Sequence, residues 1–460
     1  MYQTIIQKLE NKKIAILGFG REGVSTYNFI KKHHINCDLT IIDANDKLFE
    51  KNAYLLEDKS LNFVLGDKYL DNLSIYDLII KTPGISLKDC AILSFQDKIT
   101  SQLELVLEVF KDSCIGITGT KGKSTTTSLI YRIFKDQGYD TYLLGNIGIP
   151  LLDYVHQFTD NSILVIEMSA HQLEFVKTSP KYGIVLNLFE EHLDHFGSLN
   201  NYYEAKLNMF KYQGSDDYAL YLEDNKTLKK YIETNHYLSH KLTISMENKA
   251  DTYCDDKYVY VKKDNDLKKV YDVDNKRYLL GIHNLIDIMF ALTISNIFNL
   301  KSEDTIKTIN NFKGLEHRLE LVGTYNDVIY YNDAIATIPE ATINAITTLK
   351  NVDTLIFGGM DRGINYDSLV KFLAQSSVQN LIAMKDTGYT IGDKIKKYGT
   401  NNNIYYVDSL EEAAAIAKKR TQKGKICLLS PAAPSYNAFK NFEEKGTKYK
   451  ELIKENEEDL

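Results

Sequence analysis

Short apolar runs that end in glycine loops recur along this chain, and stretches with helical periodicity follow them. The first run is KIAILG at residues 13–18, and a second, CIGITG, occupies residues 114–119. An apolar run of this length beside a glycine turn is typical of a strand that is buried on both faces. Parallel strands need a crossover connection, usually a helix, so the alternation predicts an α/β fold with helices on both faces of a parallel sheet.

The strand–helix pattern forms three successive series. We expect one domain in residues 1–101, a second in 102–313 and a third in 314–460, each long enough to bury its own core. The polar segment 213–280 has several aspartate-rich turns and predicts an antiparallel patch, whereas 281–298 predicts a helix. The further expected strands are LTIID (39–43), YDLIIKTPG (76–84), ILVIEMS (163–169), YGIVLNL (182–188), VIYYNDA (328–334), TLIFGG (354–359), NLIAMK (380–385) and KICLLSP (425–431).

Composition argues against several classes of protein. Of the 460 residues, 44% are hydrophobic and 25% are charged, as in an ordinary globular protein. No run approaches the ~18 apolar residues of a membrane-spanning helix, and we expect no signal peptide. The five cysteines form no Cys-x-x-Cys pair, which argues against disulfides or zinc and favours a reducing cytoplasm. The net charge of −7 argues against a general nucleic-acid-binding protein.

The first glycine loop has the pattern Gly18-x-Gly20-x-x-Gly23, between an expected strand and an expected helix. Asp43 follows at the end of the next expected strand. This arrangement satisfies the dinucleotide fingerprint, in which glycines let the backbone approach a pyrophosphate at a helix N-terminus. The pattern is weakly specific, so a bound nucleotide of some kind and a simple tight turn both remain open.

The second glycine loop resembles a phosphate-binding P-loop. In such a loop backbone N–H groups cradle phosphates, a lysine neutralises their charge, and a hydroxyl can ligate Mg²⁺. Lys123 and Ser124 suit these two roles, although Ile117 stands where the strict motif has glycine. We predict ATP binding here, with an incidental glycine–lysine turn as the alternative. The predicted ATP residues of this loop are Gly119, Thr120, Lys121, Gly122, Lys123, Ser124 and Thr125.

Other polar residues fit a metal and phosphate site. Glu167 ends one expected strand and His192 follows another, and strand ends converge on the ligand crevice of an open α/β sheet. Next to a P-loop, Glu167 is a candidate Mg²⁺ ligand, although it could equally cap a helix. His192 could be an ordinary loop histidine. Arg318 and Arg362 lie in glycine-flanked loops and suit phosphate or carboxylate binding, with a surface position as the alternative.

Several longer segments follow one another in the order and spacing of one enzyme family, the Mur ligases. The whole chain resembles this family, and most of all its glutamate-adding branch. EMSAHQLE is similar to the family's E-x-S-S-F-Q-L-E, and SPAAPSYNAFKNFEEKG to its S-P-A-x-A-S-x-D-x-F-K-N-F-E-x-R-G. The resemblance implies a Rossmann-like UDP-sugar-binding domain, a central P-loop ATPase domain and a Rossmann-like glutamate-binding domain. The other matching segments are TGTKGKSTT, NIGIP, EEHLDH, AKLNMF, GIHN and GLEHRLE.

The resemblance also implies the reaction. ATP would phosphorylate the carboxylate of UDP-N-acetylmuramoyl-L-alanine, and the amino group of glutamate would displace phosphate from the acyl phosphate. This is a cytoplasmic step of peptidoglycan precursor synthesis, and hence of cell-wall formation and cell division. D-glutamate is the usual substrate of this branch. We expect a monomer that uses ATP and two Mg²⁺ ions, with no nucleic-acid or membrane partner.

By family position, Lys123, Glu167, His192 and Lys206 form the catalytic set. Ser124 or Thr125 with Glu167 would ligate the first Mg²⁺, and His192 the second. Lys206, otherwise an ordinary helical lysine, matches a lysine that CO₂ carbamylates in the family, and the carbamate would hold Mg²⁺. The implied UDP-sugar residues are Gly20, Arg21, Glu22, Asp43, Thr82, Gly84, Asn146 and Ser169, so the first glycine loop would hold no dinucleotide cofactor.

Asn284, Arg318 and Asp333 would bind ATP, with His317 beside them. The family's N-D-S-K-A-T-N reads NDAIATI at 332–338, so a serine and a lysine are missing, the lysine at Ile335. Asp287 also replaces a usual asparagine, which removes the usual adenine contact. The implied glutamate-binding residues are Thr337, Arg362, Ser435, Tyr436 and Phe442.

Arg362 stands where the family has a glutamate-site lysine, and a guanidinium can grip a carboxylate with two hydrogen bonds. Similar departures occur in a divergent branch that adds L-glutamate, so the enantiomer stays open. A folylpolyglutamate synthase-like ligase is a further alternative, but residues 1–101 argue against it. An NAD-dependent oxidoreductase or a non-catalytic P-loop protein would leave most of the matching segments unexplained.

Overall fold

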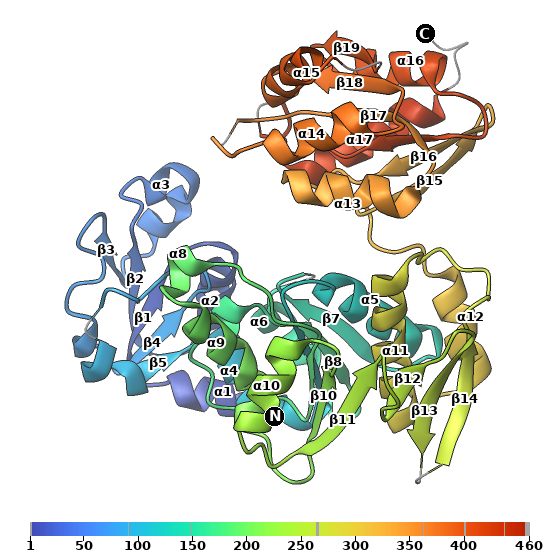
Figure 1. Ribbon diagram of the computed structural model, residues 1–460. Helices are drawn as coiled ribbons and strands as arrows, with labels where there is room; N and C mark the ends of the chain where they lie inside the picture. The colour runs from blue at the N-terminus through green and yellow to red at the C-terminus, as the bar shows by residue number, and fades with distance from the viewer. Residues whose placement is uncertain are drawn as a thin grey trace. The chain divides into compact units, whose positions relative to one another are not determined.

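The computed structural model describes residues 2–455 except 91, 148, 264–265, 362, 400–401 and 437. The chain forms two compact units (Figure 1). The first comprises Met1–Arg277 with Ile282–Asn311, and the second comprises Tyr278–Gly281 with Phe312–Leu460. Across the described residues, no helix is both long enough and apolar enough to cross a membrane.

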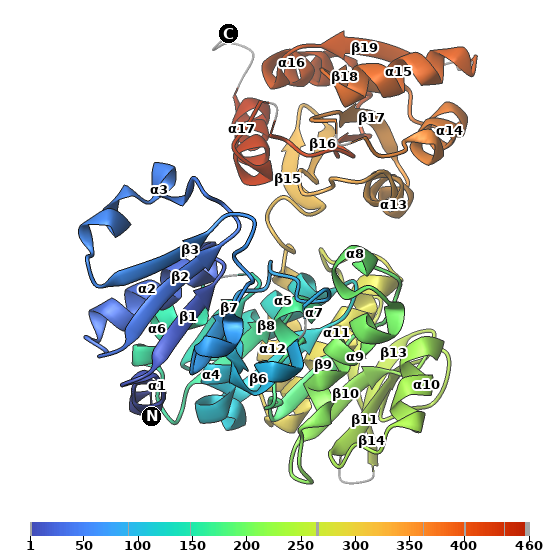
Figure 2. The same cartoon turned by 90° about the vertical axis from the view of Figure 1, so that its left-hand side faces the viewer.

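The first unit begins with a fully parallel sheet in the order β3-β2-β1-β4-β5 (Figure 2). β1 is buried along Ile14–Leu17. Ile14 and Ile16 face a core that they share with helices, whereas Ala15 and Leu17 face a second core of loop and short-turn residues that includes Tyr76 and Leu87. The expected strands at 13–18, 39–43 and 76–84 are found as β1, β2 and β4. The elements are α1 (Gln3–Leu9), β1 (Lys13–Leu17), α2 (Arg21–Lys32), β2 (Asp38–Asp43), α3 (Leu48–Lys51), β3 (Leu61–Leu65), β4 (Leu78–Lys81), β5 (Ile99–Thr100) and α4 (Gln102–Phe110).

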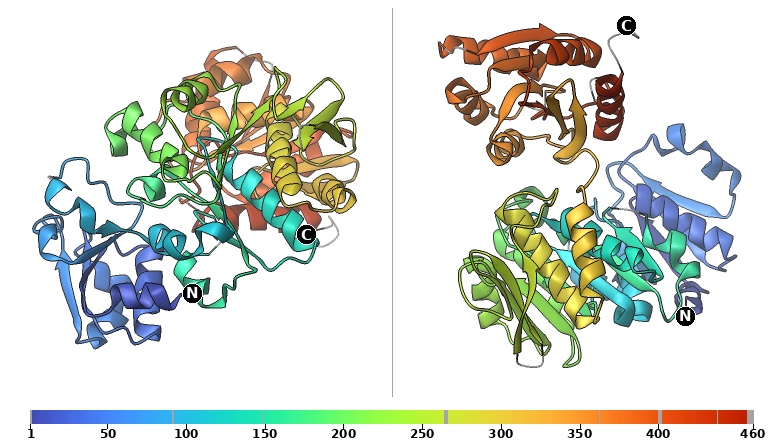
Figure 3. Two further views of the ribbon diagram at one scale, coloured as in Figure 1. Left: turned by 90° about the horizontal axis from the view of Figure 1, so that it is seen from below. Right: turned by 90° about the vertical axis from the view of Figure 1, so that its right-hand side faces the viewer.

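A second sheet of the same unit has the order β14-β13-β12-β11-β10-β9-β6-β8-β7. β6 lies inside this sheet, between β9 and β8, and is buried along its whole length. The helix after it, α5, packs against α11 and α12, which Figure 3 shows in yellow beside it. The elements are β6 (Cys114–Thr118), α5 (Lys123–Asp136), β7 (Thr141–Gly145), α6 (Leu151–Tyr154), β8 (Ile163–Glu167), α7 (Ala170–Leu173), β9 (Tyr182–Val185), α8 (Leu193–Phe196), α9 (Leu199–Lys211), β10 (Tyr218–Leu222), α10 (Lys226–Thr234), β11 (His240–Ser245), β12 (Thr252–Cys254), β13 (Tyr258–Lys263), β14 (Asp266–Asp272), α11 (Ile282–Ile297) and α12 (Ser302–Asn311).

The expected antiparallel patch at 213–280 is only partly correct. β10 and β11 are parallel to their neighbours, and antiparallel pairing is confined to β12, β13 and β14. The polar helix α10 makes the crossover between β10 and β11, so these two strands can run in the same direction. The predicted helix at 281–298 is found as α11.

The second unit contains one sheet in the order β15-β16-β20-β17-β18-β19, in which only the β15–β16 pair is antiparallel. Along β17, Leu355 and Phe357 join a core with α13, α14 and α15, whereas Ile356 points to the opposite core with α16 and α17. The predicted α/β class is therefore confirmed. The elements are β15 (Glu320–Tyr325), β16 (Val328–Asn332), α13 (Pro339–Leu349), β17 (Val352–Phe357), α14 (Asp367–Gln375), β18 (Asn380–Met384), α15 (Thr387–Lys397), β19 (Asn403–Val407), α16 (Leu410–Arg420), β20 (Ile426–Leu429) and α17 (Phe442–Lys454).

Candidate active site

The predicted phosphate loop joins the end of β6 to the start of α5. Gly122 is the N-cap of α5 and has a φ of 86°, a left-handed conformation that favours glycine. A Cβ atom at Gly122 would lie 2.8 Å from Oδ1 of Asp287, so a side chain is excluded there. The unpaired N–H groups at the start of α5, together with the helix dipole, make this loop suited to an anion. Ser124 and Thr125 are buried in the first turn of α5.

Two residues that the sequence did not single out as loop supports hold this loop in shape. Oδ1 of Asn187 accepts hydrogen bonds from the backbone N–H groups of Thr120 (3.0 Å) and Lys121 (2.9 Å), and its Nδ2 donates to the carbonyl of Lys121 (3.0 Å). Asp287 accepts a hydrogen bond of 2.9 Å from the Thr126 hydroxyl. The aspartate that replaces the family asparagine is thus buried against α5 and braces the loop.

Lys123 and Lys206 meet at a single backbone oxygen. The Nζ atoms of Lys123 and Lys206 donate to the carbonyl of Gly119 at 2.9 and 2.7 Å respectively. Lys206 lies on α9 and is only 2% exposed. Burial, assisted by the nearby charge of Lys123, holds the pKa of the Lys206 amine well below its usual value. Burial therefore favours the neutral, nucleophilic form of the Lys206 amine over the charged form.

Glu167 ends β8 in the same crevice and is 1% exposed. Its Oε1 accepts a hydrogen bond of 2.7 Å from Nδ2 of Asn146. Its Oε2 is buried and has no hydrogen-bond partner in the structure. A buried carboxylate oxygen without a partner is costly unless a ligand completes it, so this atom fits a cation.

His192 adopts a left-handed conformation (φ 56°) at the N-cap of α8, and its side chain is 47% exposed. Its ring lies edge-on to that of His171, with centroids 4.7 Å apart. Within the described residues, no three histidine, cysteine, aspartate or glutamate side chains converge tightly enough to hold a metal ion by themselves. A Mg²⁺ ion bound beside Glu167 would take further oxygen ligands from phosphates and water, as is usual beside nucleotides.

The first glycine loop is packed against the loop after β4. A Cβ atom at Gly18 (φ 91°) would lie 2.1 Å from Oγ1 of Thr82, which explains the glycine there. The Asp43 carboxylate accepts hydrogen bonds from the backbone N–H groups of Phe19 (2.7 Å) and Asn45 (2.8 Å) and so orders the loop. The structure thus brings together the N-terminal residues predicted for the UDP-sugar, with Gly84 opening onto free space.

This N-terminal group also contacts the region of the phosphate loop. Arg21 donates a hydrogen bond of 3.1 Å to the carbonyl of Gly145, next to Asn146. Glu22 accepts a hydrogen bond of 2.7 Å from Gln172. Burial raises the pKa of Glu22, although that bond and two nearby cations oppose the shift. Gln172 in turn forms a capping box with Ser169 at the start of α7, which orients Ser169.

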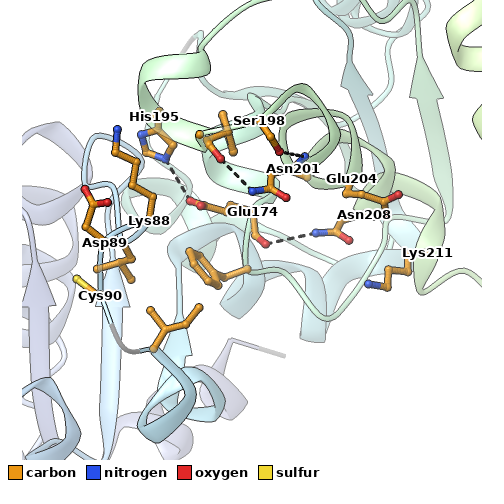
Figure 4. A pocket seen from close by; sticks show the side chains of 16 residues that line it. Lys88, Asp89, Cys90, Glu174, His195, Ser198, Asn201, Glu204, Asn208 and Lys211 are labelled. Carbon is orange, nitrogen blue, oxygen red and sulfur yellow. Dashed lines mark hydrogen bonds and ion pairs between the residues drawn. The ribbon is translucent and has the colours of Figure 1, made fainter.

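A cavity of about 660 Å³ lies beside this contact region, between the loop after β4 and helices α8 and α9 (Figure 4). Its wall includes Glu174 and His195, whose Oε2 and Nε2 atoms are 3.3 Å apart. Glu174 also pairs with Lys81 at 3.3 Å. Glu174 and His195 end the segments EMSAHQLE and EEHLDH but had no predicted role, and neither had Lys81, although a lysine at the end of a buried strand was a visible signal.

In the second unit, Asp333 lies at the end of β16 and is almost fully buried. Burial raises its pKa to about 7, although hydrogen bonds from Ser430 (2.9 Å) and the Leu319 N–H (3.1 Å) oppose the shift. The charge of Arg318 acts on the same carboxylate, and His317 is buried beside them. Asn284 belongs to the first unit, at the start of α11.

Of the described residues predicted to bind glutamate, Thr337, Ser435 and Tyr436 lie in loops that follow β16 and β20 of the second unit. Ser435 is 3% exposed, and its hydroxyl has no hydrogen-bond partner in the structure. Phe442 begins α17, with its ring 6.1 Å from that of His317. Thr337 is half-buried just before α13, and Tyr436 is exposed. Arg362 lies outside the described residues.

Three family models match successive parts of the chain. Residues 12–102 match the Mur ligase MurD-like N-terminal domain, 117–295 the Mur ligase middle domain, and 317–433 the Mur ligase glutamate ligase domain. Together they account for most of the sequence and fall in the order that the motifs predict.

Curated relatives match over nearly their whole length. A UDP-N-acetylmuramoylalanine–D-glutamate ligase of Clostridium tetani is 34% identical, with 96% of this chain and 97% of that protein covered. A protein of the same name from Acetivibrio thermocellus is 32% identical, with 97% of each chain covered.

Solved structures share the fold at lower identity. UDP-N-acetylmuramate-alanine ligase MurC from Thermotoga maritima has a TM-score of 0.58 at 18% identity and covers 96% of this chain and 99% of its own. MurF ligase from the same organism, in complex with ADP, has a TM-score of 0.57 at 16% identity and covers 97% and 95%. The motifs, the sheet topology and the full-length relatives agree, and the chain belongs to the Mur ligase family.

Proposed function

We propose that this protein is an ADP-forming ligase that joins glutamate to UDP-N-acetylmuramoyl-L-alanine. The observation that carries the proposal is the crevice in which Lys123 and Lys206 share the Gly119 carbonyl near the buried carboxylate of Glu167. The names of the full-length relatives favour D-glutamate as the amino acid. The ATP-dependent ligase class predicted from the sequence agrees with membership of the family, and the folylpolyglutamate synthase-like alternative is not favoured.

The reaction must bring two anions together, the substrate carboxylate and the γ-phosphate of ATP. Fixed cations in a buried site can stabilise the charge that develops between them. Lys123 would reach the phosphates from the first turn of α5, where the N–H groups of the loop would also meet the ligand. Asn146, beside Glu167, lies where it can orient the reacting carboxylate.

The residues present fit Mg²⁺ at this crevice. The unpartnered Oε2 of Glu167 and a hydroxyl of Ser124 or Thr125 would hold one ion, and His192 with a carbamylated Lys206 a second. Bound Mg²⁺ neutralises phosphate charge and polarises the transferred group. The neutral amine of Lys206 would attack CO₂ and lose a proton, which converts a buried amine into an anionic carbamate.

We assign the three predicted domains, 1–101, 102–313 and 314–460, to UDP-sugar, ATP and glutamate respectively. Within the first, the loops of Gly20, Arg21, Glu22, Asp43, Thr82 and Gly84 would hold the UDP moiety, and Ser169 would meet the substrate from the central domain. In the third, the unpaired hydroxyl of Ser435 supports a polar ligand there. Thr337, Arg362, Tyr436 and Phe442 complete the proposed glutamate pocket, and Asn284, Arg318 and Asp333 the ATP site. We expect a monomeric protein of the cytoplasm.

An assay with purified protein tests this function. UDP-N-acetylmuramoyl-L-alanine, ATP–Mg²⁺ and either D- or L-glutamate are mixed, and ADP and the ligated product are measured. We expect product with D-glutamate and little with L-glutamate. Product with L-glutamate alone would favour the divergent branch, and turnover only with another amino acid would refute glutamate addition.

A further inference from the structure

Helix α8 is too short to hold its own position. It has four residues, it begins at the left-handed His192, and its C-cap Gly197 is also left-handed. A histidine in this conformation is strained by about 1 kcal/mol or more, and such strain persists only where surrounding contacts fix it. The position of the proposed Mg²⁺ ligand therefore depends on what holds α8.

Two of the contacts that hold α8 come from the loop after β4, in addition to the hydrogen bond of 3.0 Å that Asn201 of α9 donates to the carbonyl of Phe196. The Ser86 hydroxyl donates to the carbonyl of His195 at 2.9 Å, and Lys88 donates to the carbonyl of Asp194. Both donors lie on the loop that follows Thr82 and Gly84, the proposed seat of the sugar nucleotide. The loop that would hold the UDP-sugar thus also touches the helix that would present His192.

Glu174 is the charged link in this contact region. Its Oε2 lies 3.3 Å from Nζ of Lys81, the last residue of β4, and 3.3 Å from Nε2 of His195. The side chains of Lys81 and His195 are only 3% and 8% exposed, so water screens the Lys81–Glu174 pair poorly. Figure 4 shows the Glu174 carboxylate directed at the His195 ring. Removing one partner from such a group leaves a buried charge without compensation.

We propose, on the basis of the function proposed above, that Glu174 is a positioning residue that links the sugar-nucleotide loop to the metal loop. Through Lys81 it fixes the end of β4, next to Thr82, and through His195 it fixes α8 and hence His192. Its loss should weaken binding at both places together, although Glu174 itself touches neither ligand. Partners that orient metal ligands typically change metal affinity or activity about 10–100-fold when they are removed.

The test uses the full-length chain with Glu174→Gln, which keeps the size of the side chain and removes its charge. We expect the KM for the UDP-sugar and the Mg²⁺ concentration for half-maximal activity each to rise about tenfold, while the KM for glutamate changes less than about twofold. Glu104→Gln is the matched control. Glu104 is also a buried carboxylate, but it accepts hydrogen bonds only from the backbone N–H groups of Lys177 and Thr178 and from the Thr178 hydroxyl.

Direct binding separates this proposal from the ligase function. UDP is titrated by calorimetry, and Mn²⁺ with a non-hydrolysable ATP analogue is titrated by electron paramagnetic resonance. Both affinities should fall in Glu174→Gln and not in Glu104→Gln, even if the wild type failed to ligate glutamate. Lys81→Met provides a second route if Glu174→Gln folds poorly, and it should weaken UDP and Mn²⁺ together. Unchanged Mn²⁺ affinity in either folded variant, or equal losses in Glu104→Gln, would overturn the proposal.

Discussion

At the scale of the single residue, Lys123 carries the charge that the phosphate loop needs. Replacing Lys123 with alanine should reduce ADP formation at least about a hundredfold, because a fixed cation at the transferred phosphate is lost. UDP binding should persist, since the proposed UDP residues lie on other loops. ADP release and UDP calorimetry measure the two effects.

The matched control for Lys123 is Lys135→Ala, on the exposed last turn of the same helix. Lys135→Ala should leave both ADP formation and UDP binding unchanged. Normal ADP formation in Lys123→Ala would refute the role of Lys123 in phosphate binding.

Lys206 should carry a carbamate because burial favours its neutral, nucleophilic amine. Protein equilibrated with ¹³CO₂ should give a carbamate resonance in the ¹³C spectrum, and Lys206→Met should lack this resonance and lose most ligase activity. Lys206→Met keeps the buried Lys445, whose pKa is lowered to about 7, so this variant also shows whether a buried amine elsewhere in the chain forms a carbamate. Full activity in a wild type without the resonance would contradict the role assigned to Lys206.

A glycine loop and a strand end mark Lys123 and Glu167 in the sequence, whereas only the family resemblance singles out Lys206 and implies the roles of all three. Asn187 and Glu174 could not be assigned in this way. Their roles consist of contacts with segments that are distant in sequence, such as the Asn187 amide with the backbone of Thr120 and Lys121. Such pairings depend on how the loops pack, which residue spacing does not encode.

At the scale of the element, the Asn187 side chain, two residues after β9, makes the largest number of the hydrogen bonds that brace the phosphate loop. Asn187→Ala removes three hydrogen bonds to the backbone of the loop, so the loop should lose its ordered form. We expect the KM for ATP to rise about tenfold, with roughly 1–3 kcal/mol lost from the free energy of unfolding. Steady-state kinetics and urea unfolding measure these changes.

Asn235→Ala is the control for the phosphate loop. The Asn235 side chain donates a hydrogen bond of 2.9 Å to the carbonyl of Tyr231 at the end of α10, and its loss should cost about 1 kcal/mol of stability without affecting ATP. An unchanged KM for ATP in Asn187→Ala would show that the loop keeps its shape unaided.

The incorrect expectation for β10 and β11 also belongs to this scale. The crossover helix α10, KTLKKYIET, buries only Leu228 and Ile232 and is otherwise polar or partly exposed. Its weak apolar stripe resembles a turn region in sequence, and without a helix there the two strands would be expected to pair as a hairpin. The strongly apolar strands β6, β8 and β17 were identified because burial on both faces leaves a continuous apolar run.

At the scale of the whole molecule, pH should affect stability through Lys445. This lysine is fully buried, donates a hydrogen bond of 2.9 Å to the carbonyl of Gly358, and has a pKa lowered to about 7 by burial. Above that pH the folded chain has released a proton that the unfolded chain still binds. Unfolding therefore takes up a proton, and stability should rise with pH by at most about 1.4 kcal/mol per pH unit.

Urea unfolding of the wild type and of Lys445→Met at several values between about pH 7 and 8.5 measures this contribution. The free energy of unfolding of the wild type, relative to that of Lys445→Met, should increase as pH rises. A difference that does not vary with pH would mean that Lys445 stays protonated in the folded chain.

The carbonyl oxygen of Gly119 resembles a phosphate in one respect, because it gathers two lysines around a single acceptor. A phosphate oxygen of an incoming nucleotide would replace that carbonyl as an acceptor for Lys123, whose side chain is already ordered in the folded chain. The conformational entropy of Lys123 is lost on folding, so nucleotide binding does not bear that cost again.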